Sequence, residues 1–311
     1  MHAVRSGGAT VGWTTGRCHT VNVLVGGRVV QIARGPRGNT CPPYAHTEPY
    51  FALSGTRALW VTFANGNTVY QDVFGGVVGR RPWHVEQAMG DTGGGYGDYV
   101  TGVARAGGRL FYSVINEDHT SGCDDGLESC ERWVDETKSR VMMLAGRGAK
   151  KLPSLPAAFR LAGGEHRLAI AVAAQHLKQE MPQQSGEIHV FAVPSLRRVA
   201  TAHVGAEIRS VGVSDAALAV LTIGRIRRFD ATGAALGTTT VPASVREISV
   251  AGTRVAYAAG DEIRVLDERN GRVLVSAHAR QPLDVSIAGG RVVWAERQGR
   301  RTRILALQLP R

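Results

Sequence analysis

The chain has 311 residues, 43% of them hydrophobic, and no run approaches the roughly 18 consecutive apolar residues that a membrane-spanning helix needs. Its formal net charge is +11 at pH 7, and 33 of its 37 basic residues are arginines. Net charge bears on solubility more than on partner identity, and no basic helix, RNA-binding aromatic motif or zinc-finger spacing occurs, so we predict a solvated arginine-rich surface without specific nucleic-acid binding.

A turn followed by a strand recurs seven times along the chain, and the turn contains glycine in six of the copies. The copies lie at residues 6–13, 54–60, 106–112, 162–170, 214–220, 251–257 and 288–294. Five copies carry an aromatic residue at the same place: Trp13, Trp60, Tyr112, Tyr257 and Trp294. Because Ile170 and Val220 fill this place in the other two copies, we expect an apolar packing position in every repeat.

Each copy opens a unit of four short strands in about 40 to 50 residues, which is the repeat size of a propeller blade. Residues 251–277 illustrate the unit, with its apolar runs separated by short turns. A four-stranded unit has two faces to bury, so neighbouring units must stack radially around a channel. The predicted units are residues 1–49, 50–98, 99–156, 157–206, 207–243, 244–281 and 282–311.

These copies make the chain resemble the β-propeller superfamily, specifically the WD40-like, TolB-like and quinoprotein-like bacterial propellers. The resemblance covers essentially the whole chain, although the WD dipeptide and GH motif of true WD40 repeats are absent. It implies an all-β, single-domain, seven-bladed β-propeller of four-stranded blades, and it implies nothing about a substrate. A pair of β-sandwiches is the alternative interpretation of the same repeats.

The two ends of the repeat series do not complement each other. The last unit supplies three strands within residues 282–311, and the first unit begins with its innermost strand at residues 2–6. We therefore expect an incomplete last blade, and we expect that a short segment upstream of Met1 is missing.

Four cysteines, Cys18, Cys41, Cys123 and Cys130, form an even set without CxxC or zinc-ligand spacing. In the blade scheme Cys18 and Cys41 lie in loops on the same face, and Cys123 and Cys130 share one loop. We predict disulfides Cys18–Cys41 and Cys123–Cys130, which persist in oxidising compartments. An extracellular or cell-envelope location follows if a signal segment lies upstream, because none occurs at the start. The alternative is a cytoplasmic propeller with four reduced cysteines.

The long predicted loops are residues 34–49, 89–99, 115–139 and 174–186. Each connects the second strand to the third, or the fourth strand to the next unit. All four therefore fall on one face of the disc, which we call the long-loop face; the short turns occupy the opposite, tight-turn face. Because loops on rigid β-scaffolds commonly carry function, the long-loop face is the predicted binding surface.

Loop 115–139 is unusually acidic for a basic protein. It holds eight carboxylates, Glu117, Asp118, Asp124, Asp125, Glu128, Glu131, Asp135 and Glu136. Several oxygen ligands in a short loop suit calcium, so Asp118, Asp124, Asp125 and Glu128 are candidate ligands, although their order differs from an EF-hand. The alternative is a solvated loop closed by Cys123 and Cys130, and we predict no other cofactor.

Five further residues are candidates for contact with a ligand or partner. Tyr96 and Asp98 follow a glycine-rich stretch and offer a stacking surface and an acceptor. His46, His119 and His176 lie on three long loops, where imidazoles could bind zinc or copper or could simply face solvent.

No GxSxG motif and no cysteine–histidine pair indicates a nucleophile. We therefore predict a non-catalytic, monomeric binding or scaffold propeller that engages a protein or polysaccharide partner through the long-loop face. The alternative is a hydrolase or lyase whose site lies at the channel mouth on the same face, where Asp98, His119 and His176 would converge.

Overall fold

The computed structural model describes residues 3–7, 9–15, 20–34, 50–65, 68–91, 96–119, 132–177, 184–299 and 301–310. The all-β prediction is confirmed, since these residues form strands and turns without an α-helix. No helix in this part of the chain is long and apolar enough to cross a membrane.

Four sheets repeat the same four-stranded antiparallel meander. The first contains β1 (Ala3–Gly7), β2 (Thr10–Thr15), β3 (Thr20–Val25) and β4 (Arg28–Arg34). Another contains β14 (Ala158–Gly163), β15 (Arg167–Ala173), β17 (Gln184–Ala192) and β18 (Arg198–His203). The next contains β19 (Ser210–Val213), β20 (Ala217–Thr222), β21 (Arg225–Asp230) and β22 (Ala235–Thr240). The fourth contains β23 (Ile248–Ala251), β24 (Arg254–Ala259), β25 (Glu262–Asp267) and β26 (Val273–His278).

The second and third predicted units share one ten-stranded sheet. Its first half contains β5 (Phe51–Ser54), β6 (Arg57–Asn65), β7 (Thr68–Val77) and β8 (Trp83–Asp91). Its second half contains β9 (Gly97–Ala106), β10 (Arg109–His119), β12 (Arg140–Ala145) and β13 (Gly148–Lys151). A single pair, Gly90 opposite Gly97, joins β8 to β9.

Strands extend into three segments that the sequence predicts as loops. β8 continues to Asp91, and β10 continues to His119, where it pairs with β11 (Arg132–Val134). β11 in turn pairs with β16 (His176–Leu177). Loops 89–99, 115–139 and 174–186 are therefore shorter than predicted, because pairing with strands both earlier and later in the chain satisfies the backbone hydrogen-bonding groups at their ends.

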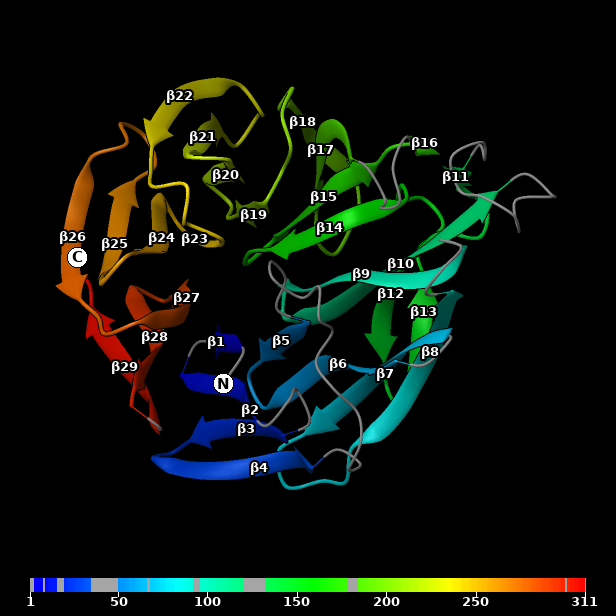
Figure 1. Ribbon diagram of the computed structural model, residues 1–311, viewed down its shortest axis with the longest axis horizontal. Coiled ribbons are helices and arrows are strands. Elements are labelled where there is room, and N and C mark those ends of the chain that lie inside the picture. The colour runs from blue at the N-terminus through cyan, green and yellow to red at the C-terminus, as the bar shows by residue number, and fades with distance from the viewer. Residues whose placement is uncertain are drawn as a thin grey trace.

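The first strands of the successive sheets contact one another in a ring. β1 contacts β5, and the series continues through β9, β14, β19, β23 and β27 (Pro282–Ala288), which contacts β1. Figure 1 shows the sheets radiating from this centre, with β1 inside and outer strands such as β4 and β26 at the periphery. The last sheet contains three described strands, β27, β28 (Arg291–Gln298) and β29 (Arg301–Gln308).

The recurrent glycine serves the turn between the first and second strands of a unit. Gly107 and Gly252 both have φ of 56°, in the left-handed region that glycine enters without a Cβ penalty. The conserved spacing of the repeat therefore places a tight hairpin at the same end of each sheet.

The apolar position that follows this turn lies in the second strands. Trp60, Tyr112, Tyr257 and Trp294 are at most 5% exposed, which confirms the predicted packing position. Ile170 and Val220 are fully buried there as well, whereas Trp13 is partly exposed.

Candidate functional site

Exposed large side chains occur near the ends of β7, β8 and β9 that adjoin the long-loop face. Tyr70 and Met89 lie directly opposite each other on these strands and are 37% and 53% exposed. Tyr96, 46% exposed, precedes β9, and its ring lies 5.0 Å from the ring of His119. We call Tyr70, Met89, Tyr96 and His119 the aromatic patch; the sequence predicted two of its members.

Two glycines allow the strands under the aromatic patch to approach closely. A Cβ at Gly97, where φ is 110°, would lie 2.5 Å from the backbone oxygen of Met89. A Cβ at Gly90 would collide with the ring of Tyr99. These glycines admit neighbouring backbone and an aromatic ring, and they hold the Met89 backbone against Gly97, next to Tyr96 in the chain.

A charged network fixes the strands behind the aromatic patch. Arg140 donates to Glu86 through Nε at 3.0 Å and to Asp98 through Nη2 at 2.8 Å. Tyr112 donates its hydroxyl to Glu86 at 2.5 Å, and Asn116 donates Nδ2 to Asp98 at 2.7 Å. Burial and the neighbouring Glu86 carboxylate raise the pKa of Tyr112. Asp98 therefore positions β9 against β10 and β12, and its carboxylate is already occupied by two donors.

Of the remaining predicted site residues, the structure describes Asp118 and His176. Asp118 accepts from the Nζ of Lys138 at 3.3 Å and from the backbone nitrogen of His119 at 2.9 Å. Both Asp118 and His176 pair with Trp133 of β11, on opposite sides, so one strand separates them by about 10 Å. His46, Asp124, Asp125, Glu128 and the four cysteines lie outside the described residues.

A cavity of about 300 Å³ lies at the other end of the ring. Its walls are the ends of the innermost strands and the turns that follow them, so it belongs to the tight-turn face. Its charged lining residues are Arg5, Arg105, Glu165, Asp215 and Glu247. The prediction had placed a channel-mouth site on the long-loop face, because long loops are conspicuous in a sequence and short turns are not.

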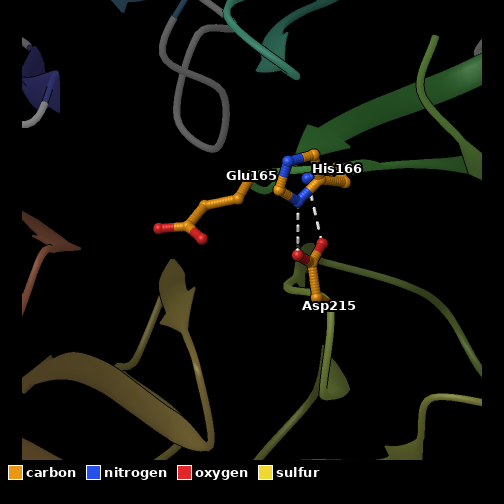
Figure 2. A group of neighbouring side chains, drawn as sticks. All are labelled: Glu165, His166 and Asp215. Carbon is orange, nitrogen blue, oxygen red and sulfur yellow. Dashed lines mark hydrogen bonds and ion pairs between the residues drawn. The ribbon is translucent and has the colours of Figure 1, made fainter.

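Three side chains at the rim of this cavity could hold a divalent cation. One ligand atom from each of Glu165, His166 and Asp215 lies within 4.8 Å of the others, and all three residues are exposed. The His166 Nδ1 lies 2.6 Å from Asp215 Oδ2, and the His166 backbone nitrogen donates to Oδ1 at 2.9 Å (Figure 2). The hydrogen bond and charge of Asp215 raise the pKa of His166.

The contacts within this cluster are the two hydrogen bonds between His166 and Asp215, which join the β14–β15 turn to the β19–β20 turn. One imidazole with two carboxylates matches the ligand types of zinc and other transition-metal sites. The sequence did carry a signal for it: Glu165 and His166 follow the two glycines of the fourth copy, and Asp215 stands in place of the usual glycine in the fifth copy, as "GGEHR" and "SDA" show.

A second ionic cluster joins the first sheet to the last two. Arg5 donates from Nη1 to Asp284 at 2.8 Å and from Nη2 to Glu247 at 2.6 Å. Asp284 also accepts from the backbone nitrogens of Val4 and Val285, at 2.6 and 2.7 Å. Burial opposes the charge on Arg5, but Asp284 and Glu247 raise its pKa. Burial and the adjacent Asp284 raise the pKa of Glu247 well above its usual range, against the opposing effect of Arg5.

No protein-family model and no curated protein matches the chain significantly. Solved structures, in contrast, do match the chain. Sqt1 of Saccharomyces cerevisiae superposes with a TM-score of 0.50 and 10% identity, over 100% of this chain and 96% of Sqt1. A chain of the mitotic checkpoint complex superposes with a TM-score of 0.52 and 14% identity, over 95% of this chain and 87% of that chain. BamB from Moraxella catarrhalis superposes with a TM-score of 0.48 and 13% identity, over 95% of this chain and 81% of BamB. At these identities the likeness concerns the fold alone.

Proposed function

Because the chain has the β-propeller fold, we propose that it is a single-domain, seven-bladed, non-catalytic binding or scaffold propeller that engages a protein partner through its long-loop face. The observation that carries this proposal is the aromatic patch. Of the eight exposed large hydrophobic residues in the described part of the chain, Tyr70, Met89 and Tyr96 lie on adjoining strand ends of this one face.

Tyrosine and methionine are enriched in protein interfaces. Tyrosine contributes a large contact area at a small cost in conformational entropy, because its side chain has only two rotatable bonds to its ring. The Arg140, Glu86 and Asp98 network lies on the strands that carry the aromatic patch. It holds those strands in one arrangement, so a partner would meet a preorganised surface. The engagement of Asp98 by Arg140 and Asn116 also favours a positioning role over acid–base chemistry.

Photo-crosslinking from position 96 tests the proposal and identifies the partner. A benzophenone amino acid at Tyr96 should capture one protein from an extract of the expressing cells. Against that purified partner, Met89→Asp and Tyr96→Ala should each weaken binding by about 30-fold, as expected when a central interface anchor worth about 2 kcal/mol is lost.

The matched control is Leu236→Asp, which places the same charge at an apolar side chain of β22 that is 41% exposed. Its affinity for the partner should equal that of the unmodified protein. Equal affinity of the Met89 and Tyr96 variants would refute the proposal, and capture of a polysaccharide instead of a protein would change the partner class.

We also propose that the protein is exported, which rests on the four cysteines. Protein recovered from its native source in the presence of iodoacetamide should carry no adduct before reduction and four after it. Proteolysis without reduction should yield the Cys18–Cys41 and Cys123–Cys130 linked peptides. Four adducts before reduction would instead support the cytoplasmic alternative, because thiols are kept reduced there.

A further inference from the structure

The cavity on the tight-turn face holds an arginine that has no partner within the described part of the chain. Arg105 lies next to the last residue of β9 and lines this cavity. Its Nε is buried but has no hydrogen-bond acceptor among the described residues, and its guanidinium forms no ion pair with them. Burying a charged donor without an acceptor is costly, so this arrangement indicates that an acceptor from outside the chain meets the guanidinium.

Serine side chains line the same cavity in a regular series. The hydroxyls of Ser210, Ser249 and Ser286 each accept a backbone N–H of the next innermost strand, at 3.1 to 3.3 Å. Each hydroxyl also carries a proton of its own to donate, and these protons have no acceptor among the described residues. The wall therefore offers a molecule in the cavity several O–H donors besides the guanidinium.

The series of serines stops at Ser6 of β1. This residue lines the cavity and is 8% exposed, and its Oγ has no hydrogen-bond partner in the described part of the chain. Its backbone nitrogen, in contrast, donates to the Oγ of Ser286 at 3.1 Å. Buried hydroxyls are normally hydrogen-bonded, so Ser6 is a second group in the cavity wall, independent of Arg105, that a polar ligand would satisfy.

The charges around the cavity favour a ligand with one negative charge. The other arginine of the lining, Arg5, is held by Asp284 and Glu247. Burial raises the pKa of Glu247 well above its usual range, so this cluster is close to neutral. Asp215 and Glu165 are exposed at the rim, where water screens their charges. The guanidinium inside the cavity is therefore left without a counter-charge, and a single carboxylate would neutralise it.

We propose that this cavity binds a small monocarboxylic acid, whose carboxylate accepts hydrogen bonds from the Arg105 guanidinium and the Ser6 hydroxyl. Arginine recognises a carboxylate through two parallel N–H donors, and hydrogen bonds between charged groups are stronger than those between neutral groups. The volume of about 300 Å³ is at the lower end for small-molecule sites, which limits the ligand to a short chain. Apolar lining residues such as Leu53 and Val103 suit a hydrocarbon tail. The site lies on the face opposite the aromatic patch, so it goes beyond the proposed protein-binding function and does not depend on it.

The probe is hexanoate, and hexanamide is its uncharged counterpart of nearly the same shape. Isothermal titration calorimetry in a chloride-free buffer should show that hexanoate binds to one site with a dissociation constant of about 1 mM, as expected for a ligand of this size. Hexanamide should bind about tenfold more weakly, because it lacks the charge that pairs with Arg105.

Arg105→Gln removes the charge and should weaken hexanoate binding by about 30-fold, the effect of a lost charged hydrogen-bonding partner. Arg147→Gln makes the same charge change in the exposed turn between β12 and β13. It is the matched control and should bind hexanoate normally, as should Met89→Asp, which alters only the aromatic patch. Circular dichroism establishes that each variant is folded.

Should Arg105→Gln misfold, Ser6→Ala provides the second test. It should weaken hexanoate binding by about fivefold, the effect of one neutral hydrogen bond. The urea midpoint of this variant should stay unchanged, because the Ser6 hydroxyl has no partner among the described residues to lose. A serine with a merely structural role would instead lower the midpoint and leave the affinity for hexanoate as it was.

Absence of hexanoate binding would show that solvent alone satisfies Arg105, and would overturn the proposal. Equal binding of hexanoate and hexanamide, or an unchanged affinity in folded Arg105→Gln, would do the same. Hexylphosphonate distinguishes the other class of anion. Tighter binding of this dianion than of hexanoate would show that the cavity is not a monocarboxylate site, and would equally overturn the proposal.

Discussion

Arg5→Ala is expected to lower the free energy of unfolding by about 3 to 5 kcal/mol, because it leaves a buried carboxylate without its cation. The Asp284 side chain is 2% exposed, and Arg5 is its charged partner. The same guanidinium also pairs with Glu247, which lies immediately before β23. The variant should unfold at a lower urea concentration, as followed by tryptophan fluorescence.

The loss of stability in Arg5→Ala should arise from the broken ion pairs between the first sheet and the last two, and not from the removal of a positive charge as such. Arg147→Ala removes the same charge from an exposed turn between β12 and β13 and should change stability by no more than about 0.5 kcal/mol. In a double-mutant cycle, Arg5→Met combined with Asp284→Asn should cost less than the sum of the two single changes. A loss below about 1 kcal/mol in Arg5→Ala would show that the cluster does not hold the ends together.

Raising the pH from 5 to 8 is expected to destabilise the protein through Glu268. This residue is 1% exposed, and its Oε1 has no hydrogen-bond partner among the described residues. Burial raises the pKa of Glu268 to about 7, with Asp267 and Asp230 adding to the effect and Arg228 opposing it. Arg228 donates its Nη1 to the backbone oxygen of Glu268 at 2.5 Å, not to the carboxylate.

The sign of this pH dependence of stability follows from the linkage between proton binding and folding. The folded state binds the Glu268 proton more tightly than the unfolded chain, whose pKa is near 4.5. The stabilisation is therefore complete below pH 4.5 and is lost as the pH rises through about 7. At pH 8 the free energy of unfolding is therefore lower than below pH 4.5 by at most about 3 kcal/mol, as far as Glu268 is concerned.

Glu268→Gln should isolate this effect, because glutamine has nearly the same shape and does not ionise. Urea unfolding at pH 5 should find the variant close to the unmodified protein, and at pH 8 it should find the variant more stable. Glu207→Gln, at an exposed position, is the control and should follow the unmodified protein at both pH values. A constant difference between Glu268→Gln and the unmodified protein across this range would contradict the assignment.

The strand pattern of the repeats could be read from local sequence. The turn at Gly252 requires a left-handed residue, and the runs around Ile263 and Val265 alternate as a half-covered strand does. The aromatic position of each copy predicted burial correctly at Trp60 and Tyr257 for the same reason. Such signals act over a few residues and need no knowledge of distant partners.

Strand ends in polar segments could not be read in this way. The residues around His119 carry no apolar alternation, so they resemble a loop, yet β10 continues through them because β11 pairs with it. The stabilising partner, Arg132–Val134, follows 12 undescribed residues later. Pairing across such a distance depends on tertiary contacts, which a local pattern does not encode.

The sequence by itself determined an all-β chain of repeated meanders, its buried second-strand positions and the three strands of its last unit. Only the tertiary structure decided which residues meet. Ring closure brings Arg5 to Asp284 across 279 residues, sets His166 beside Asp215 at the cavity rim, and places Met89 near Tyr96 on the long-loop face. The physical reason is that strand and turn preferences are local, whereas these contacts depend on how the sheets stack around one centre.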